Sequence, residues 1–188
     1  MRFKELNEVS PPTFQGSLTP DLLKSKIWLC NNLKKLGRKK FSTIYILGSW
    51  YGTMSVVLDR CGIEFDKVIN VDADQSHIDI SNKLLSALDL NHECIHGDAN
   101  QLKYKQLDKN SLIINTSTND IEGERWFDRI PKGTLVALQS RNNVDTPKYQ
   151  TLKELDQEFF LNDLLFLDEI TLEDPETQYQ RFMKIGVK

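Results

Sequence analysis

Two glycines and one acidic residue have the spacing of a nucleotide-binding turn. Gly48 ends a short apolar run, Gly52 follows four residues later, and Asp72 lies 24 residues after Gly48. The first glycine permits a tight turn at the end of a strand, and the second lets a helix begin close to a ligand, where its free N–H groups can hold an anion. An acid about 20 residues further on can accept hydrogen bonds from a ribose diol. The pattern predicts a ligand at the turn after the first strand of an α/β fold.

Asp72 also has an interpretation as a helix cap. An aspartate before a helix often accepts a hydrogen bond from the first turn, and Asp74 could fill either role. In addition, Trp50 stands where the dinucleotide fingerprint has its middle glycine. The glycine pattern is therefore incomplete, and its meaning depends on the elements that follow.

Polar residues follow the later strands of the expected sheet. Ligands bind outside the carboxyl ends of the strands in an open α/β sheet. The sequence therefore nominates Asn115, Thr116 and Ser117 as hydrogen-bonding groups that position a substrate. Gln139 and Ser140 would face them across the cleft. The alternative is that all five cap helices and satisfy backbone groups of loops.

Hydrophobic periodicity predicts the strands and helices that position these residues. Strands are expected at residues 41–47, 67–72, 92–96, 112–114 and 134–138. Helices are expected at residues 54–61, 78–88, 122–130 and 151–161. Two further strands, at 164–172 and 179–187, flank a short polar linker and should form an antiparallel hairpin at one edge. The alternation implies an α/β domain with a mostly parallel sheet.

The amino-terminal segment differs from this core. Residues 1–18 contain two adjacent prolines and a Gly-Ser pair, so we expect an irregular arm. Phe14, Gln15 and Ser17 could bring this arm over the cleft as a lid. Residues 19–37 are expected to form a leading helix, with a hydroxyl cap and a proline at its start and a glycine at its end. We expect residues 1–188 to form a single domain.

The composition is typical of a protein in the cytoplasm. The 188 residues are 39% hydrophobic and carry a net charge of −3, which neither requires nor forbids a polyanionic partner. No apolar run has the roughly 18 residues that a membrane span needs, and the first residues lack the apolar core of a signal peptide. The three cysteines are widely spaced and fit neither a metal site nor a disulfide framework. We therefore expect a cytoplasmic protein with no metal and no membrane partner.

One basic cluster leaves a nucleic-acid partner open. Five lysines and arginines lie within residues 34–40. Cations are favourable at the carboxyl end of a helix, so a solvated helix end accounts for most of them. Contact with a nucleic acid is the weaker interpretation.

The order of these features resembles the class I S-adenosylmethionine-dependent methyltransferases. Residues 44–53 look like the first motif of that family, and residues 68–72 look like the second, which ends in a ribose-binding acid. Residues 96–99 are similar to the third motif, whose acid faces the adenine amino group. Residues 112–115 look like the strand beside the transferred methyl, and residues 131–136 like the turn into the fifth strand. The closing hairpin, with a reversed last strand, distinguishes this family from dinucleotide folds.

The resemblance implies a three-layer Rossmann-like methyltransferase fold whose seven-stranded sheet is mostly parallel with an antiparallel C-terminal hairpin strand. It implies S-adenosylmethionine as the cofactor and a small molecule, or an exposed group of a macromolecule, as the methyl acceptor. It places Asn115, Thr116 and Ser117 near the transferred methyl. The implied cofactor-binding residues are Gly48, Ser49, Trp50, Gly52, Asp72, Ala73, Asp98 and Ala99.

The sequence departs from the family pattern at three places. Ile46 stands where the family usually has an acid, and Trp50 replaces a glycine. Residues 115–118 lack the Asn/Asp-Pro-Pro-aromatic signature of enzymes that methylate amino groups of DNA or glutamine, which argues against those substrates. A methyltransferase-fold protein without activity, which binds cofactor or a partner, is the alternative function. A nicotinamide-dependent oxidoreductase is a third, which the hairpin and Trp50 oppose.

Overall fold

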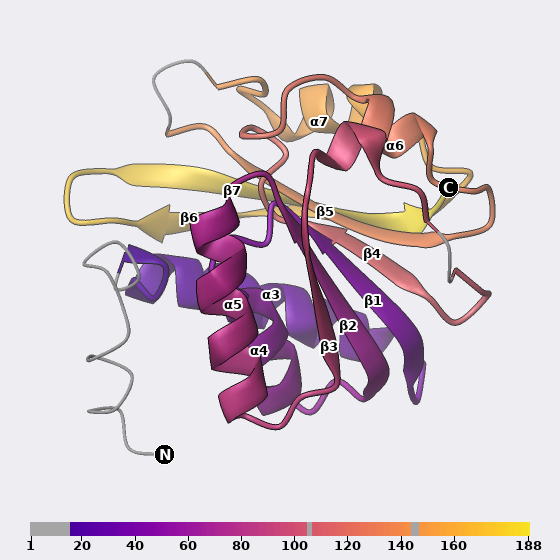
Figure 1. The fold of residues 1–188 in the computed structure, drawn as a ribbon. Coiled ribbons are helices and arrows are strands. Elements are labelled where there is room, and N and C mark those ends of the chain that lie inside the picture. Colours follow the sequence, from indigo (N-terminus) through magenta and orange to yellow (C-terminus); the bar gives the residue numbers. More distant parts are fainter. Residues whose placement is uncertain (1–15, 105–106, 144–146) are drawn as a thin grey trace.

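The computed structural model describes residues 16–104, 107–143 and 147–188, which form one seven-stranded sheet flanked by helices (Figure 1). The strand order is β3-β2-β1-β4-β5-β7-β6, and β7 runs antiparallel to both of its neighbours. The strands are β1 (Phe41–Leu47), β2 (Phe65–Asp72), β3 (His92–His96), β4 (Leu112–Asn115), β5 (Leu135–Arg141), β6 (Asp163–Glu173) and β7 (Gln178–Val187). The helices are α3 (Pro20–Lys35), α4 (Thr53–Arg60), α5 (Gln75–Ala87), the 3₁₀ turn η1 (Ala99–Gln101), α6 (Arg125–Asp128) and α7 (Leu152–Glu158). The expected mostly parallel sheet with a closing antiparallel hairpin is confirmed.

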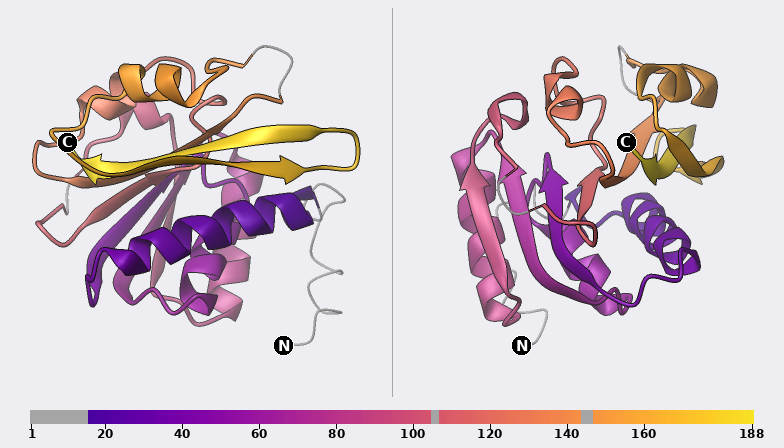
Figure 2. Two further views of the ribbon diagram at one scale, coloured as in Figure 1. Left: turned by 180° about the vertical axis from the view of Figure 1, so that it is seen from behind. Right: turned by 90° about the vertical axis from the view of Figure 1, so that its right-hand side faces the viewer.

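The two faces of the sheet have separate hydrophobic cores. Along β1, Ile44 and Ile46 pack with α3 and α4, whereas Tyr45 and Leu47 pack with α6 and α7 on the other face. All four side chains are buried, as expected for a central parallel strand covered on both faces. Figure 2 shows α3 running alongside the β6–β7 hairpin, with the sheet between the helix layers.

The leading helix is confirmed, but its cap is not the expected one. The Thr19 side chain makes no hydrogen bond to the first turn of α3. Residues 1–15, which hold most of the expected arm and the lid residues Phe14 and Gln15, lie outside the described residues. Within the described ranges, no helix has both the length and the hydrophobicity needed to cross a membrane.

The expected end of the fifth strand at residue 138 is wrong. β5 continues to Arg141 because β7 is long enough to pair with it, with Gln139 opposite Met183 and Ser140 opposite Phe182. Gln139 and Ser140 are therefore strand residues and not part of a loop. The sequence of β5 alone could not reveal this extension, since polar residues extend the strand only where a partner strand supplies hydrogen bonds.

The turn after β1 has three residues in the left-handed region. Gly48 has φ +60°, Trp50 has φ +51° and Gly52 has φ +74°. A Cβ atom at Gly52 would lie far inside van der Waals contact with Ser81 Oγ of α5. The left-handed backbone and the close approach of α4 to α5 thus both require glycine at position 52.

Substitution of Gly52 tests this packing constraint. Gly62 is the matched control, because it has a similar φ of +71° but open space where a Cβ would sit. Both Gly→Ala variants carry left-handed backbone strain, but only Gly52→Ala overpacks the contact with α5, which should cost about 1–3 kcal/mol more. Urea unfolding measures the difference. Equal destabilisation of the two variants, or no relief in a Ser81→Ala background, would contradict the packing explanation.

Candidate functional site

A cleft opens at the carboxyl edge of the sheet, where the strand order reverses between β1 and β4. It has two adjoining lobes of about 410 and 890 Å³. The smaller, which we call the α3 lobe, includes residues of α3, the turn after β1 and the loop after β4. The larger, which we call the β2 lobe, includes residues that follow β2 and β3. The lobes share Gly48, Trp50, Ser117, Asp120 and Arg141.

The end of β2 contributes a carboxylate that is bonded to the protein itself. Asp72 Oδ2 accepts a hydrogen bond from the Trp50 backbone N–H at 2.7 Å, and Oδ1 accepts one from the Asp74 N–H at 3.0 Å. His77 Nδ1 lies 3.1 Å from Oδ1. Asp74, in contrast, caps α5 by accepting from the Ser76 N–H at 2.7 Å. Asp72 therefore ties the turn after β1 to the start of α5, and the capping role belongs to Asp74.

Asp98 lies at the end of β3 and also lines the β2 lobe. Its Oδ1 accepts a hydrogen bond from the Asn100 N–H at 2.8 Å and so caps η1. Ala73 and Ala99 line the same lobe. Two carboxylates from neighbouring strand ends thus line one cavity.

Trp50 lines both lobes. Its ring stacks on Tyr51 with centroids 5.1 Å apart and meets His77 edge-on at 6.3 Å. A left-handed conformation costs a non-glycine residue roughly 1–2 kcal/mol. The hydrogen bond from its N–H to Asp72 helps to hold Trp50 there.

The loop after β4 supplies hydroxyl groups to the α3 lobe. Thr116 and Ser117 line this lobe, as does Ser49, whose buried Oγ has no hydrogen-bond partner among the described residues. Asn115 is fully buried and is not among the lining residues; its Oδ1 accepts from the Ser117 N–H at 2.8 Å. Asn115 therefore shapes the loop, whereas its two neighbours face the cavity. Gly52 lines neither lobe.

Of the two β5 candidates, only one reaches the cleft. Ser140 lines the α3 lobe. Gln139 is fully buried; its Oε1 accepts from Ser25 Oγ at 3.1 Å, and its Nε2 donates to the Ser25 carbonyl oxygen. The expectation that Gln139 faces the cleft is wrong, because its amide instead joins β5 to α3.

Two buried cations in the α3 lobe escaped the sequence analysis. Arg181 of β7 is 5% exposed, and Lys26 of α3 is 8% exposed. Burial lowers the pKa of Arg181 to about 10. Burial, with Arg181 as a further cause, lowers the pKa of Lys26 to about 8. Neither side chain forms an ion pair within the described part of the chain. Sequence could not identify them, since a lysine in a helix or an arginine in an edge hairpin is usually solvated.

The basic cluster of residues 34–40 lies away from this cleft. Arg38 donates to the Lys109 carbonyl oxygen at 2.8 Å, and Lys40 forms an ion pair with Asp66. Lys35 Nζ donates to Asn32 Oδ1 at 3.0 Å. Contacts within the protein thus account for part of the cluster.

Comparisons with solved structures identify the fold. The magnesium protoporphyrin IX methyltransferase of Synechocystis, solved with bound S-adenosylmethionine, has a TM-score of 0.65 and 10% identity over 94% of this chain and 85% of its own. A methyltransferase of Geobacter sulfurreducens, in complex with S-adenosylhomocysteine, has a TM-score of 0.61 and 12% identity over 90% and 92%. A methyltransferase of Aquifex aeolicus has a TM-score of 0.57 and 10% identity over 98% of each chain. No family model and no curated protein matches the sequence. The chain therefore has the class I S-adenosylmethionine-dependent methyltransferase fold, and the resemblance is confirmed at that level.

The buried charge of Lys26 makes a stability test possible. Its folded pKa of about 8 lies below the unfolded value of 10.5, so between these values the unfolded state binds more protons and stability rises with pH. Below about pH 8, both states are protonated and the full burial penalty remains, roughly 3 kcal/mol for a shift of this size. We expect Lys26→Met to be more stable than the wild type at pH 7, with the gap closing towards pH 10.

Urea unfolding of both proteins from pH 7 to pH 10 measures this gap, and titrating groups that do not interact with Lys26 cancel in the difference. A pH-independent gap, or a Met variant that is less stable at pH 7, would show that Lys26 is not a buried unpaired cation.

Proposed function

We propose that the protein is an S-adenosylmethionine-dependent methyltransferase that acts on a small molecule or on an exposed group of a macromolecule. The observation that carries the proposal is the two-lobed cleft at the reversal point of the sheet, with Asp72 and Asp98 in one lobe and the turn after β1 between the lobes. The fold similarity to methyltransferases solved with this cofactor or its product supports the same conclusion.

The residues of the cleft fit the cofactor. Asp72 and Asp98 provide acceptors for a ribose and an adenine amino group in the β2 lobe, beside Ala73 and Ala99. Gly48 and the buried hydroxyl of Ser49 provide polar groups at the turn. The acceptors in the β2 lobe suit an adenosine, and the polar groups at the turn suit the amino-acid chain that it carries.

Asp21 of α3 supplies an acid to the α3 lobe, whereas Ile46 stands where the family usually has one. Both residues line the α3 lobe, and the Asp21 carboxylate is 6% exposed. Its pKa is lowered because hydrogen bonds from Thr19, Tyr179 and the backbone outweigh the opposing effect of burial. Asp21 is therefore an anion that can meet the ammonium group of the methionine end.

The cofactor would supply an electrophilic methyl group on a sulfonium. The work left to this chain is to align the acceptor and to keep water out. Thr116 and Ser117 can orient the acceptor through hydrogen bonds, while Asn115 holds their loop. Trp50 covers the junction of the lobes, and Asp120, which lines both, can take a proton from an acceptor that must lose one.

A protein of this fold that binds cofactor without transferring a methyl is the second candidate. The observation that favours it is the state of Asp72, whose two oxygens already accept hydrogen bonds from Trp50 and Asp74. Its capacity for a ribose is thereby reduced. Both candidates bind the cofactor and differ only in turnover.

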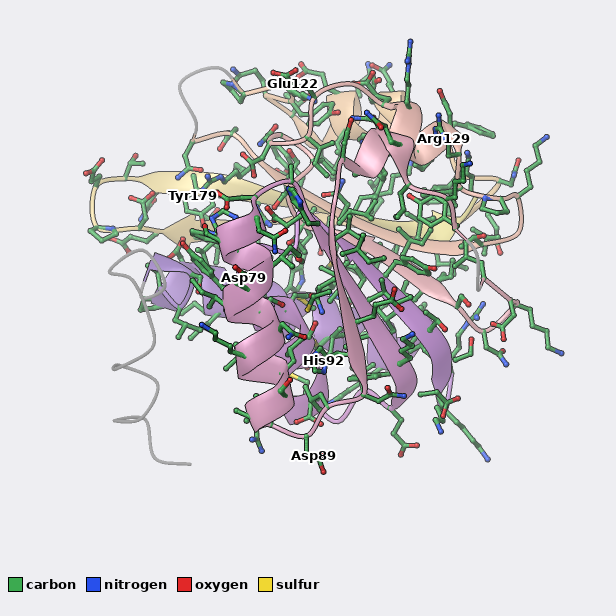
Figure 3. The ribbon with its side chains drawn as sticks, in the orientation of Figure 1. Asp79, Asp89, His92, Glu122, Arg129 and Tyr179 are labelled. Carbon is green, nitrogen blue, oxygen red and sulfur yellow. The ribbon has the colours of Figure 1, made fainter. Side chains whose placement is uncertain are left out.

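Calorimetric titration tests the shared part of the proposal. We expect S-adenosylhomocysteine to bind at sub-millimolar concentration and NAD not to bind. Asp98→Ala should weaken binding about tenfold or more, as for a lost hydrogen bond to a charged group. Asp79→Ala, which changes an exposed residue of α5 (Figure 3), is the control and should bind S-adenosylhomocysteine as the wild type does.

Thermal unfolding of Asp98→Ala checks that loss of the η1 cap has not unfolded the chain. Absence of binding by the wild type would end the cofactor proposal. Equal affinity of Asp98→Ala and the wild type would remove Asp98 from the site.

A further inference from the structure

The α3 lobe contains a lysine that is buried without an ionic partner. Lys26 lines the cavity and is 8% exposed, and its Nζ makes no hydrogen bond or ion pair within the described residues. Burying an unpaired ammonium group destabilises a fold, and a hydrophobic residue of similar size in its place often stabilises it. A buried cation at a cavity wall is therefore best explained by a ligand that completes its environment.

Arg181 faces the same lobe with only neutral partners. Its Nε donates to Ser25 Oγ at 2.9 Å, and its Nη2 donates to the Thr116 carbonyl oxygen at 2.8 Å and to Gln139 Oε1 at 3.3 Å. Nη1 makes no hydrogen bond within the described part of the protein. The guanidinium is thus fixed in direction by three bonds to neutral groups, and the charges of Asp120 and Asp21 favour its protonated form without forming an ion pair with it.

None of the described acids that line this lobe forms an ion pair with Lys26 or Arg181, although the charge of Asp21 favours the protonated form of both. Asp21 Oδ2 accepts from the Tyr179 hydroxyl at 2.6 Å. Asp174 accepts from two backbone N–H groups of its own turn and from Asn143. Asp120 and Glu176 are exposed. No described carboxylate forms an ion pair with either buried cation.

We propose that Lys26 and Arg181 form a subsite for an anionic group, a carboxylate or a phosphate, of the ligand that occupies the α3 lobe. Arg181 presents its Nη1 group in a fixed orientation, and Lys26 adds a second charge from α3. Such an anion would offset the burial of both cations. The anionic group has two sources under the proposed function: the amino-acid carboxylate of the cofactor, or an acidic group on the methyl acceptor.

Inorganic phosphate is the probe that needs no knowledge of the acceptor. The proteins are the wild type, Lys26→Met and, as a matched control, Lys24→Met, which changes an exposed lysine of the same helix. At pH 7, phosphate should raise the Tm of the wild type and of Lys24→Met above that in chloride of equal ionic strength. By calorimetry, Lys26→Met should bind phosphate at least tenfold more weakly. A Tm of Lys26→Met without phosphate at or above that of the wild type would show that it folds.

A competition experiment identifies the source of the anionic group. The ligands are S-adenosylhomocysteine and 5′-methylthioadenosine, which lacks the amino-acid group. If phosphate weakens the binding of S-adenosylhomocysteine but not that of 5′-methylthioadenosine, the subsite binds the cofactor carboxylate. Lys26→Met should then lose affinity for S-adenosylhomocysteine alone. If phosphate and S-adenosylhomocysteine bind together, the subsite takes an acidic group of the acceptor.

Different results would refute the anion subsite and the proposed cofactor. Lys26-dependent phosphate binding without any binding of S-adenosylhomocysteine would sustain the anion subsite and refute the cofactor. The subsite is refuted if phosphate binds the wild type and Lys26→Met with equal affinity. It is also refuted if phosphate binds neither protein and the ratio of the affinities for S-adenosylhomocysteine and 5′-methylthioadenosine is the same in both.

Discussion

One buried guanidinium holds the α3 lobe together. From β7, Arg181 donates hydrogen bonds to Ser25 of α3, to the Thr116 carbonyl oxygen after β4 and to Gln139 of β5. These elements are distant in sequence, and the Arg181 side chain contacts all three of them. The antiparallel β7 strand, which distinguishes this fold, is thus also the strand that fixes the loop where an acceptor would lie. Such a fixed wall suits a reaction that depends on alignment.

The β2 lobe depends on a second charged group, the carboxylate of Asp72. It holds the Trp50 N–H and the start of α5 at the same time. Trp50 can therefore occupy a left-handed conformation where related patterns have glycine, and it lines both lobes. Strained residues of this kind tend to occur at ligand sites. A cleft is present at this turn although Trp50 replaces the glycine.

The periodic parts of the chain could be predicted from sequence, because burial on one or both faces imposes a pattern. The buried strands β1 and β4 follow from such patterns. Hydrogen bonds between polar residues that are distant in sequence impose no such pattern. The extension of β5, the bonding of Gln139 to α3 and the partner of Asp72 each depend on which segment lies opposite. Lys26 is the clearest case, since nothing in a helix sequence distinguishes a buried lysine from a solvated one.

In the proposed binding mode, the adenosine of the cofactor lies in the β2 lobe and its amino-acid chain lies in the α3 lobe. A crystal structure of the protein with S-adenosylhomocysteine tests it most directly. We expect the adenine and ribose between Asp98 and Asp72, and the amino-acid end beyond Trp50, towards Asp21. Density for the nucleoside elsewhere on the protein, or a cleft that stays empty at saturating ligand, would contradict the account.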